Sequence, residues 1–204
     1  MLTEKELAVA RGAKGFMPDD EGLELHDAGV DGGRVGPLLE IGSYCGKSGV
    51  YLGAAARARG VVLFTLDHHH GSEENQAGWE HHDADVVDPR TGRMDTLPFF
   101  RRTIEDAGLE DVVVGVLGDS PTVGRFWNAP LGLLFVDGGH AEDIAMADYV
   151  TWAHHVLADG VLAIHDVFED PYEGGQAPFH VWERAVADGF TPLSTTGSLR
   201  TLRR

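Results

Sequence analysis

The sequence of 204 residues predicts one α/β domain, built on a doubly wound, mostly parallel sheet of seven strands with helices on both faces. Short apolar runs rich in Val, Leu and Ile alternate with longer stretches that show helical periodicity or helix caps, which indicates repeated strand–helix units. The apolar runs are nearly continuous, as expected for parallel strands that helices cover on both faces. Two final segments around a turn predict an antiparallel strand pair at the C-terminal end of the sheet.

The first 34 residues are expected to form a helical cap segment, and residues 35–204 the main body of the single domain. Thr3 to Glu6 is a capping-box pattern that predicts a short helix ending at Ala10. Pro18 to Glu21 predicts the start of a second helix. The segment from Gly29 to Gly36 is expected to be a glycine-rich joint that leads into the first strand.

Five parallel strands and four helices are expected after this joint. The predicted parallel strands are Pro37–Ile41, Val61–Leu66, Val112–Leu117, Leu131–Val136 and Gly160–Ile164. The predicted helices are Lys47–Arg59, Leu97–Ala107, Glu142–Leu157 and a last one near Phe179–Ala187. The antiparallel pair is expected at Phe190–Leu193 and Ser198–Arg203, joined through Thr195-Thr196-Gly197.

Composition limits the partners and the compartment. The formal net charge is −17, which disfavours nucleic acid and anionic membranes because the field of the protein would repel phosphate. A neutral or cationic small molecule fits this charge better. The N-terminal residues carry charges where a signal peptide needs an apolar run, and no apolar segment reaches the roughly 20 residues that span a bilayer. The single cysteine, Cys45, suits a reducing compartment, so we expect a cytoplasmic protein.

The loop after the first strand ends in Gly46-Lys47-Ser48, like a phosphate-binding P-loop. A P-loop needs four residues between its glycines, whereas only three separate Gly42 from Gly46, so a nucleotide triphosphatase is disfavoured. The dinucleotide fingerprint G-x-G-x-x-G is missing too, because Tyr44 occupies the position of its second glycine. A dinucleotide-dependent oxidoreductase remains an alternative, since Asp67 would suit the ribose of NAD.

Every predicted parallel strand is followed by polar residues that include an acid. They are Glu40 to Ser43, Asp67-His68, Gly118-Asp119-Ser120, Asp137 to His140, and His165-Asp166. Ligands of doubly wound sheets bind beyond the carboxyl ends of the strands, so these residues are expected at one rim. Each acid could instead cap the helix that follows it. Five acids at one rim favour a ligand site.

Glu40 to Gly46 has the spacing E-x-G-x-x-x-G and directly follows a strand, and Asp67 and Asp119-Ser120 follow the next two strands. With these motifs the chain from about Pro37 onward resembles the class I S-adenosylmethionine-dependent methyltransferases, whose fold is Rossmann-like. The resemblance implies S-adenosylmethionine as cofactor, with its methionine part at the glycine loop and at the N-terminus of the following helix. It also implies that Asp67 accepts hydrogen bonds from the ribose and that Asp119 and Ser120 contact the adenine. The implied cofactor-binding residues are Glu40, Gly42, Ser43, Gly46, Ser48, Asp67, His68, Asp119, Ser120 and Asp137.

The segments Leu134–His140 and Leu162–Val167 are similar to the small-molecule O-methyltransferases that include antibiotic-sugar and macrolide-tailoring enzymes. This similarity implies catalytic roles for His140, as general base, and for Asp137 and His165. It also implies a divalent cation, Mg²⁺ or another, on Asp137, Asp166 and His165. Close relatives often have a second acid at the position of His165, which leaves the metal open. Adjacent strand residues face opposite ways, so we favour Asp166 as the ligand and His165 as its neighbour.

The segment from Asp67 to Asp95 has little periodicity and contains five histidines, from His68 to His82. A loop this long is usually functional or disordered, and for its stretch from His68 to Gln76 a lid over the acceptor is favoured, ahead of a solvated surface loop and a metal site. Trp79 is the substrate-contact candidate in this loop. The resemblance implies that the acceptor is a hydroxyl of a sugar or another natural product. Small relatives often form pairs, so a homodimer is expected as well. A relative of the fold that binds ligand without catalysis is a further alternative.

Overall fold

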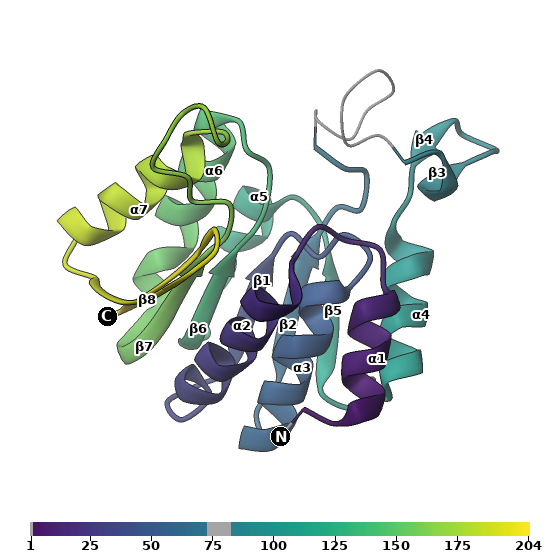
Figure 1. Ribbon diagram of the computed structural model, residues 1–204, viewed down its shortest axis with the longest axis horizontal. Helices are drawn as coiled ribbons and strands as arrows, with labels where there is room; N and C mark the ends of the chain where they lie inside the picture. The colour runs from purple at the N-terminus through teal and green to yellow at the C-terminus, as the bar shows by residue number, and fades with distance from the viewer. Residues whose placement is uncertain (1, 73–82) are drawn as a thin grey trace.

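The computed structural model describes residues 2–72 and 83–204 and confirms the predicted sheet (Figure 1). The seven strands lie in the order β5-β2-β1-β6-β7-β9-β8. Neighbours among the first five are parallel, whereas β9 is antiparallel to both β7 and β8. The strands are β1 (Leu38–Ile41), β2 (Leu63–Asp67), β5 (Val113–Leu117), β6 (Leu131–Val136), β7 (Val156–Ile164), β8 (Thr191–Thr196) and β9 (Leu199–Arg203). The chain order reverses between β1 and β6, which makes their carboxyl ends the expected ligand crevice.

Helices cover both faces of the sheet, as the apolar strand runs predict. They are α1 (Glu4–Gly12), α2 (Asp19–Gly32), α3 (Lys47–Arg59), α4 (Leu97–Ala107), α5 (Ser120–Gly124), α6 (Glu142–Trp152) and α7 (Ala177–Ala187). One buried cluster joins the sheet to α2, α3 and α4, with Leu25 and Phe100 among its members. A second cluster joins the opposite face to α6 and α7 through Trp152 and Val181. The two helical layers are visible on either side of the strands in Figure 1.

The N-terminal helices begin where the sequence predicts. Thr3 caps α1, and its hydroxyl accepts a hydrogen bond from the backbone N–H of Glu6 while the Glu6 side chain bonds back to Thr3. The prediction of a glycine-rich joint from Gly29 to Gly36 is partly wrong, because α2 continues to Gly32. A Cβ at Gly29 would lie 2.8 Å from the Cβ of Ala55, so this glycine lets α2 approach α3 closely while remaining helical.

The predicted boundary between the helix Glu142–Leu157 and the strand Gly160–Ile164 is also wrong. Helix α6 ends at Trp152, a 3₁₀ turn covers Ala153–His155, and β7 already begins at Val156. Val156 is buried and pairs with Leu131 of β6, and this sheet contact outweighs the helical periodicity of the local sequence.

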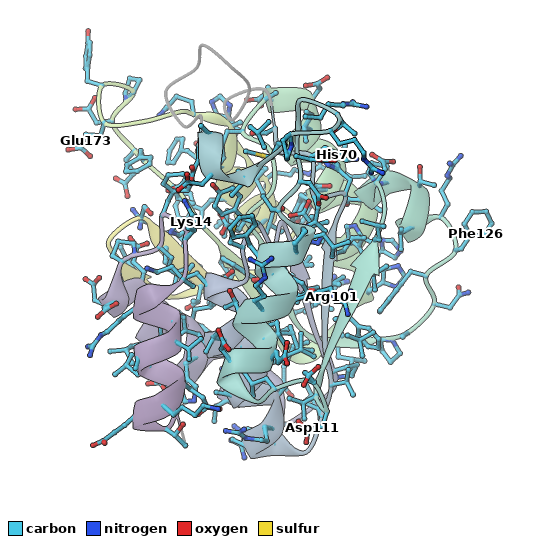
Figure 2. All side chains as sticks on the ribbon, turned by 90° about the vertical axis from the view of Figure 1, so that its right-hand side faces the viewer. Lys14, His70, Arg101, Asp111, Phe126 and Glu173 are labelled. Carbon is cyan, nitrogen blue, oxygen red and sulfur yellow. The ribbon has the colours of Figure 1, made fainter. Side chains whose placement is uncertain are left out.

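The long segment after β2 contains a small two-stranded sheet, β3 (Val87–Asp88) and β4 (Arg93–Met94). Lys14, in the link between α1 and α2, ties this segment to the body (Figure 2). Its Nζ lies 2.5 Å from Asp83 and 3.0 Å from Asp85. Glu73 to Gln76 of the predicted lid lie outside the described residues, and so do the substrate-contact candidate Trp79 and the histidines His81 and His82. Within residues 2–72 and 83–204, no helix is long and apolar enough to cross a membrane.

Candidate functional site

The loop from Gly42 to Gly46, called the glycine loop below, connects β1 to α3 at the crevice. Gly42 and Gly46 both have φ +87°, in the left-handed region that favours glycine. A Cβ at Gly42 would overlap the backbone carbonyl oxygen of Asp137. The backbone of the glycine loop therefore packs directly against the backbone at the end of β6. The glycine loop and the buried side chains of Glu40 and Ser43 are together called the cradle below.

Asp67 at the end of β2 holds the glycine loop in place. One carboxylate oxygen accepts hydrogen bonds from the backbone N–H groups of Ser43 and Tyr44, both at 2.9 Å. The other oxygen accepts from the N–H of His69 at 2.7 Å. Tyr44 has φ +44° and is held in this uncommon conformation by these bonds. Asp67 therefore organises the loop, in addition to the ribose contact that the sequence predicts for it.

Glu40 is the most unusual carboxylate of the crevice. It is fully buried, and neither of its oxygens has a hydrogen-bond partner among the residues that the structure describes. Burial raises the pKa of Glu40 to about 8, and the nearby Ser48 and Ser43 hydroxyls offset this rise only in part. The buried Ser43 hydroxyl also has no partner in the described structure. Such unpaired groups cost free energy, which is recovered if a polar ligand occupies the cradle.

The remaining predicted cofactor residues lie at the same rim with local partners. Asp119 caps α5 and accepts hydrogen bonds from the N–H and the hydroxyl of Thr122 at 3.1 and 2.6 Å. The hydroxyl of Ser120 accepts from the indole N–H of Trp152 at 2.8 Å. His68 is exposed, and its Nδ1 accepts from the N–H of His70 at 3.1 Å. The helix-capping alternative thus holds for Asp119, and its contact with adenine stays a prediction.

The ends of β6 and β7 bring together all four residues predicted for catalysis or metal binding. The strands are neighbours, and β7 ends at Ile164. Asp166 has φ +55°, so the chain turns sharply and both His165 and Asp166 reach the side of Asp137. The Nε2 of His140 lies 3.2 Å from a carboxylate oxygen of Asp166. His165 and Asp166 can reach one site only if the strand ends before them, and β7 does end there.

His165 is surrounded by three carboxylates. Its Nδ1 lies 3.1 Å from Asp137 and 3.3 Å from Asp166, and its Nε2 lies 2.6 Å from Glu21 of α2. Burial opposes the charged ring, but these carboxylates outweigh burial and raise the pKa of His165 far above its ordinary value. Burial would likewise raise the pKa of Asp166, yet the bonds from His140 and His165 lower it.

One donor atom from each of Asp137, His140 and Asp166 can lie within 4.8 Å of the others, which fits a divalent cation. His165 does not join this group, because both of its ring nitrogens face carboxylates and none is left for a metal. The geometry therefore favours His140 over His165 as the third candidate ligand, and a metal at this site stays a prediction. This agrees with the preference for Asp166 as ligand and His165 as its neighbour.

Glu21 is the site residue that the sequence analysis missed. It is 3% exposed and lies 144 residues before its partner His165. The pattern Pro18 to Glu21 predicts a helix start. Acids in the first turn of a helix normally lie at the surface, where they interact favourably with the helix dipole. No local signal distinguishes a first-turn acid that points inward, so only the tertiary structure identifies Glu21.

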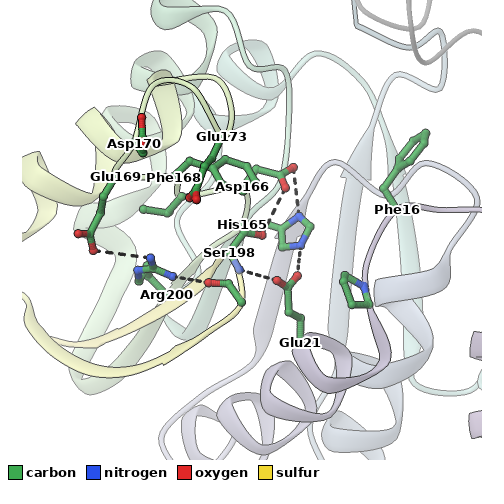
Figure 3. Close-up of a pocket in the computed structure, with 13 residues that line it drawn as sticks. Phe16, Glu21, His165, Asp166, Phe168, Glu169, Asp170, Glu173, Ser198 and Arg200 are labelled. Carbon is green, nitrogen blue, oxygen red and sulfur yellow. Dashed lines mark hydrogen bonds and ion pairs between the residues drawn. The ribbon is translucent and has the colours of Figure 1, made fainter.

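A pocket of about 730 Å³ opens beside these residues (Figure 3). His165 and Asp166 line it, together with Phe16, Phe168 and Arg200 among others. Figure 3 shows the bonds from Glu21 to His165 and to Ser198 at this wall. The guanidinium of Arg200 donates to the backbone carbonyl of Gly197 at 2.8 Å. The pocket places a space for a small molecule next to Asp166, the partner of His140.

A model of a known protein family, described as a methyltransferase domain, matches residues 39–167. The chain belongs to this methyltransferase domain family. The matched residues run from β1 to the end of β7 and include the glycine loop, Asp67 and the Asp137–Asp166 pair. Membership of this family excludes the alternative of a dinucleotide-dependent oxidoreductase.

Solved methyltransferase structures share the fold over nearly the whole chain. The SAH-bound methyltransferase PaMTH1 from Podospora anserina is 16% identical, with a TM-score of 0.66 over 97% of this chain and 85% of its own. An O-methyltransferase from Bacillus cereus in complex with SAH is 20% identical, with a TM-score of 0.62 over 98% and 90%. The O-methyltransferase TomG from Streptomyces achromogenes, involved in tomaymycin synthesis and solved with SAM, is 19% identical, with a TM-score of 0.63 over 98% and 90%.

Proposed function

We propose that this methyltransferase uses S-adenosylmethionine to methylate a hydroxyl of a small molecule. The observation that carries the proposal is the pairing of His140 with Asp166, which lie 3.2 Å apart, while Asp166 also lines the pocket. The O-methyltransferases among the solved structures support the same reaction class.

The residues of the crevice fit the cofactor. The α-ammonium of S-adenosylmethionine is a suitable partner for the buried, unpartnered carboxylate of Glu40. The glycine loop, with Ser43, lets a ligand approach its backbone, and the first turn of α3 at Ser48 suits a carboxylate. The cofactor supplies an electrophilic methyl group on a sulfonium. The side chains of the protein bind and orient the two reactants and take up the proton of the acceptor.

His140 is the proposed general base. An alcohol is a poor nucleophile until its proton is removed, and a positioned base contributes roughly 10²–10⁴-fold to the rate. The carboxylate of Asp166 at 3.2 Å fixes the ring of His140 and stabilises the imidazolium that forms when the proton arrives.

A divalent cation is a second way to activate the acceptor at this site. Asp137, Asp166 and His140 are the residues that would hold it, and the cation would lower the pKa of a bound hydroxyl. In that case His140 would be a ligand of the cation and would not serve as the base. A chelator distinguishes the two arrangements. Only the second would lose its catalytic rate when the cation is removed.

The test has a binding arm and a turnover arm. Isothermal titration is expected to show S-adenosylmethionine binding to the purified protein. Mass spectrometry of a panel of sugars, phenols and other hydroxyl compounds, each incubated with protein and cofactor, is expected to show a mass gain of one methylene. Absence of cofactor binding at millimolar concentration refutes the proposal. Binding with no methylated product across the panel favours the non-catalytic alternative. Repeating the active reaction with EDTA decides whether a cation takes part.

A further inference from the structure

Glu21 lies outside the matched methyltransferase domain, yet its carboxylate is part of the network around the proposed base. We propose that Glu21 is a positioning residue: through His165 it fixes the carboxylates of Asp137 and Asp166, and through Asp166 it fixes the ring of His140. This inference rests on the proposed methyl transfer, because the network is argued to serve that reaction.

Both oxygens of the Glu21 carboxylate are used. One lies 2.6 Å from Nε2 of His165, and the other accepts a hydrogen bond from the backbone N–H of Ser198 at 2.5 Å. A Cβ at Gly197 would overlap the second oxygen, so glycine at this turn leaves room for the carboxylate. Two bonds from different elements leave the carboxylate a single orientation, with one oxygen aimed at the imidazole (Figure 3).

The ring of His165 transmits this orientation to the other side of the network. With Nε2 directed at Glu21, Nδ1 faces Asp137 and Asp166 at 3.1 and 3.3 Å. Carboxylates accept hydrogen bonds, so a ring that has them at both nitrogens is held at both ends. The ring is 4% exposed and cannot rotate without exchanging a partner for an apolar neighbour such as Phe135.

Asp166 is the last member before the proposed base. Its left-handed backbone is uncommon for an aspartate, and its carboxylate contacts Ser198, His165 and His140 at 3.4, 3.3 and 3.2 Å. Ser198 therefore contacts Glu21 with its backbone and Asp166 with its hydroxyl. Loss of the Glu21 carboxylate would release His165 and Ser198 together, and both of these restrain Asp166.

A merely structural role for Glu21 is the competing explanation, since it also ties α2 to the β8–β9 turn. Glu24 on the same helix provides a matched control. Its carboxylate accepts a hydrogen bond from the Ser194 hydroxyl of β8, and it has no bond to any histidine in the described part of the chain. Glu24→Gln thus weakens the attachment of α2 to the same strand pair while leaving the network intact.

The experiment compares Glu21→Gln, Glu21→Asp and Glu24→Gln with the wild type. In Glu21→Gln the amide can accept one of the two bonds but not both, because its nitrogen is a donor. We expect kcat to fall about 10–100-fold, as for a small misplacement of a catalytic group. The dissociation constant for S-adenosylmethionine, measured by titration, is expected to be unchanged, since Glu21 does not belong to the cradle. Glu21→Asp keeps two acceptor oxygens and is expected to recover part of kcat.

A spectroscopic arm follows His140 directly, through its ring ¹H–¹⁵N signals assigned with the His140→Ala spectrum. We expect these signals to shift in Glu21→Gln and to stay unchanged in Glu24→Gln. Unchanged kcat and unchanged His140 signals in Glu21→Gln overturn the inference, and so does an equal loss of kcat in Glu24→Gln. If Glu21→Gln does not fold, Glu21→Asp replaces it in every comparison.

The two proposals fail in different ways. If the wild-type protein methylates no acceptor, the proposed function fails, and the ring signals alone then decide the positioning role. Shifted His140 signals in Glu21→Gln support it without any turnover, whereas unchanged signals reject it.

Discussion

Replacing Glu40 by glutamine is expected to stabilise the cofactor-free protein increasingly as the pH rises. The folded carboxyl has a pKa of about 8, against an ordinary value of 4.5, because it is buried and lies near the carboxylates of Asp137 and Asp67. A folded state with a raised carboxyl pKa retains a proton that the unfolded chain has lost, so stability falls as the pH rises from the unfolded towards the folded pKa. Glutamine does not titrate, so its contribution to stability does not change with pH.

The magnitude follows from the two pKa values. Between pH 6 and pH 8.5 the unfolded carboxyl is ionised throughout, whereas the folded one holds its proton until about pH 8. Each pH unit in that interval costs the wild type about 1.4 kcal/mol. The free energy of unfolding of Glu40→Gln, relative to the wild type, is therefore expected to grow by about 2–3 kcal/mol between these two pH values.

Chemical denaturation at pH 6.0, 7.0 and 8.5 measures this difference, and other titrating groups largely cancel because both proteins share them. Glu183→Gln, an exposed glutamate on α7, is the matched control and should show a constant difference across the range. A difference between Glu40→Gln and the wild type that does not change with pH would refute the argument that Glu40 is desolvated. Adding S-adenosylmethionine should favour the wild type, because the ammonium then compensates the carboxylate.

Three further substitutions test the parts of the site separately. Gly42→Ala places a Cβ against the carbonyl of Asp137 at φ +87°, and it should cost roughly 1–3 kcal/mol of stability and abolish cofactor binding, as measured by thermal unfolding and titration. Asp67→Ala removes the acceptor of three backbone N–H groups, and it should cost about 2–3 kcal/mol and abolish cofactor binding; normal affinity would contradict its role in the loop. His140→Ala should lower kcat about 10²–10⁴-fold at an unchanged cofactor dissociation constant, whereas exposed His154→Ala should have no effect; normal turnover of His140→Ala would exclude it as base.

The fold and the rim of the site could be predicted because their signals are local. A buried parallel strand needs a continuous apolar run, and the polar residues that follow it mark the carboxyl end whatever the rest of the chain does. The short spacing from Gly42 to Gly46 is also local, and the structure gives both glycines the positive φ that makes them necessary. The capping box at Thr3 is local in the same sense.

The errors concern features that depend on distant partners. The start of β7 is decided by the pairing of Val156 with Leu131, and helical periodicity cannot register that contact. The continuation of α2 through Gly29 depends on how closely α3 approaches. The sequence also could not connect His165 with Glu21, because the position of Glu21 in the first turn of a helix gives no sign of an inward carboxylate.

The hydrogen bond between Glu21 and Ser198 has a consequence for the order in which the protein matures. It joins residues 177 positions apart, so one end is synthesised near the beginning of the chain and the other near its end. Contacts of such long sequence separation form late, because a large loop must close first. The glycine loop and the parallel strands can assemble on a growing chain, whereas the surroundings of His140 are completed only when the final hairpin docks. Competence to bind cofactor is thus expected to precede competence to transfer methyl groups during biosynthesis.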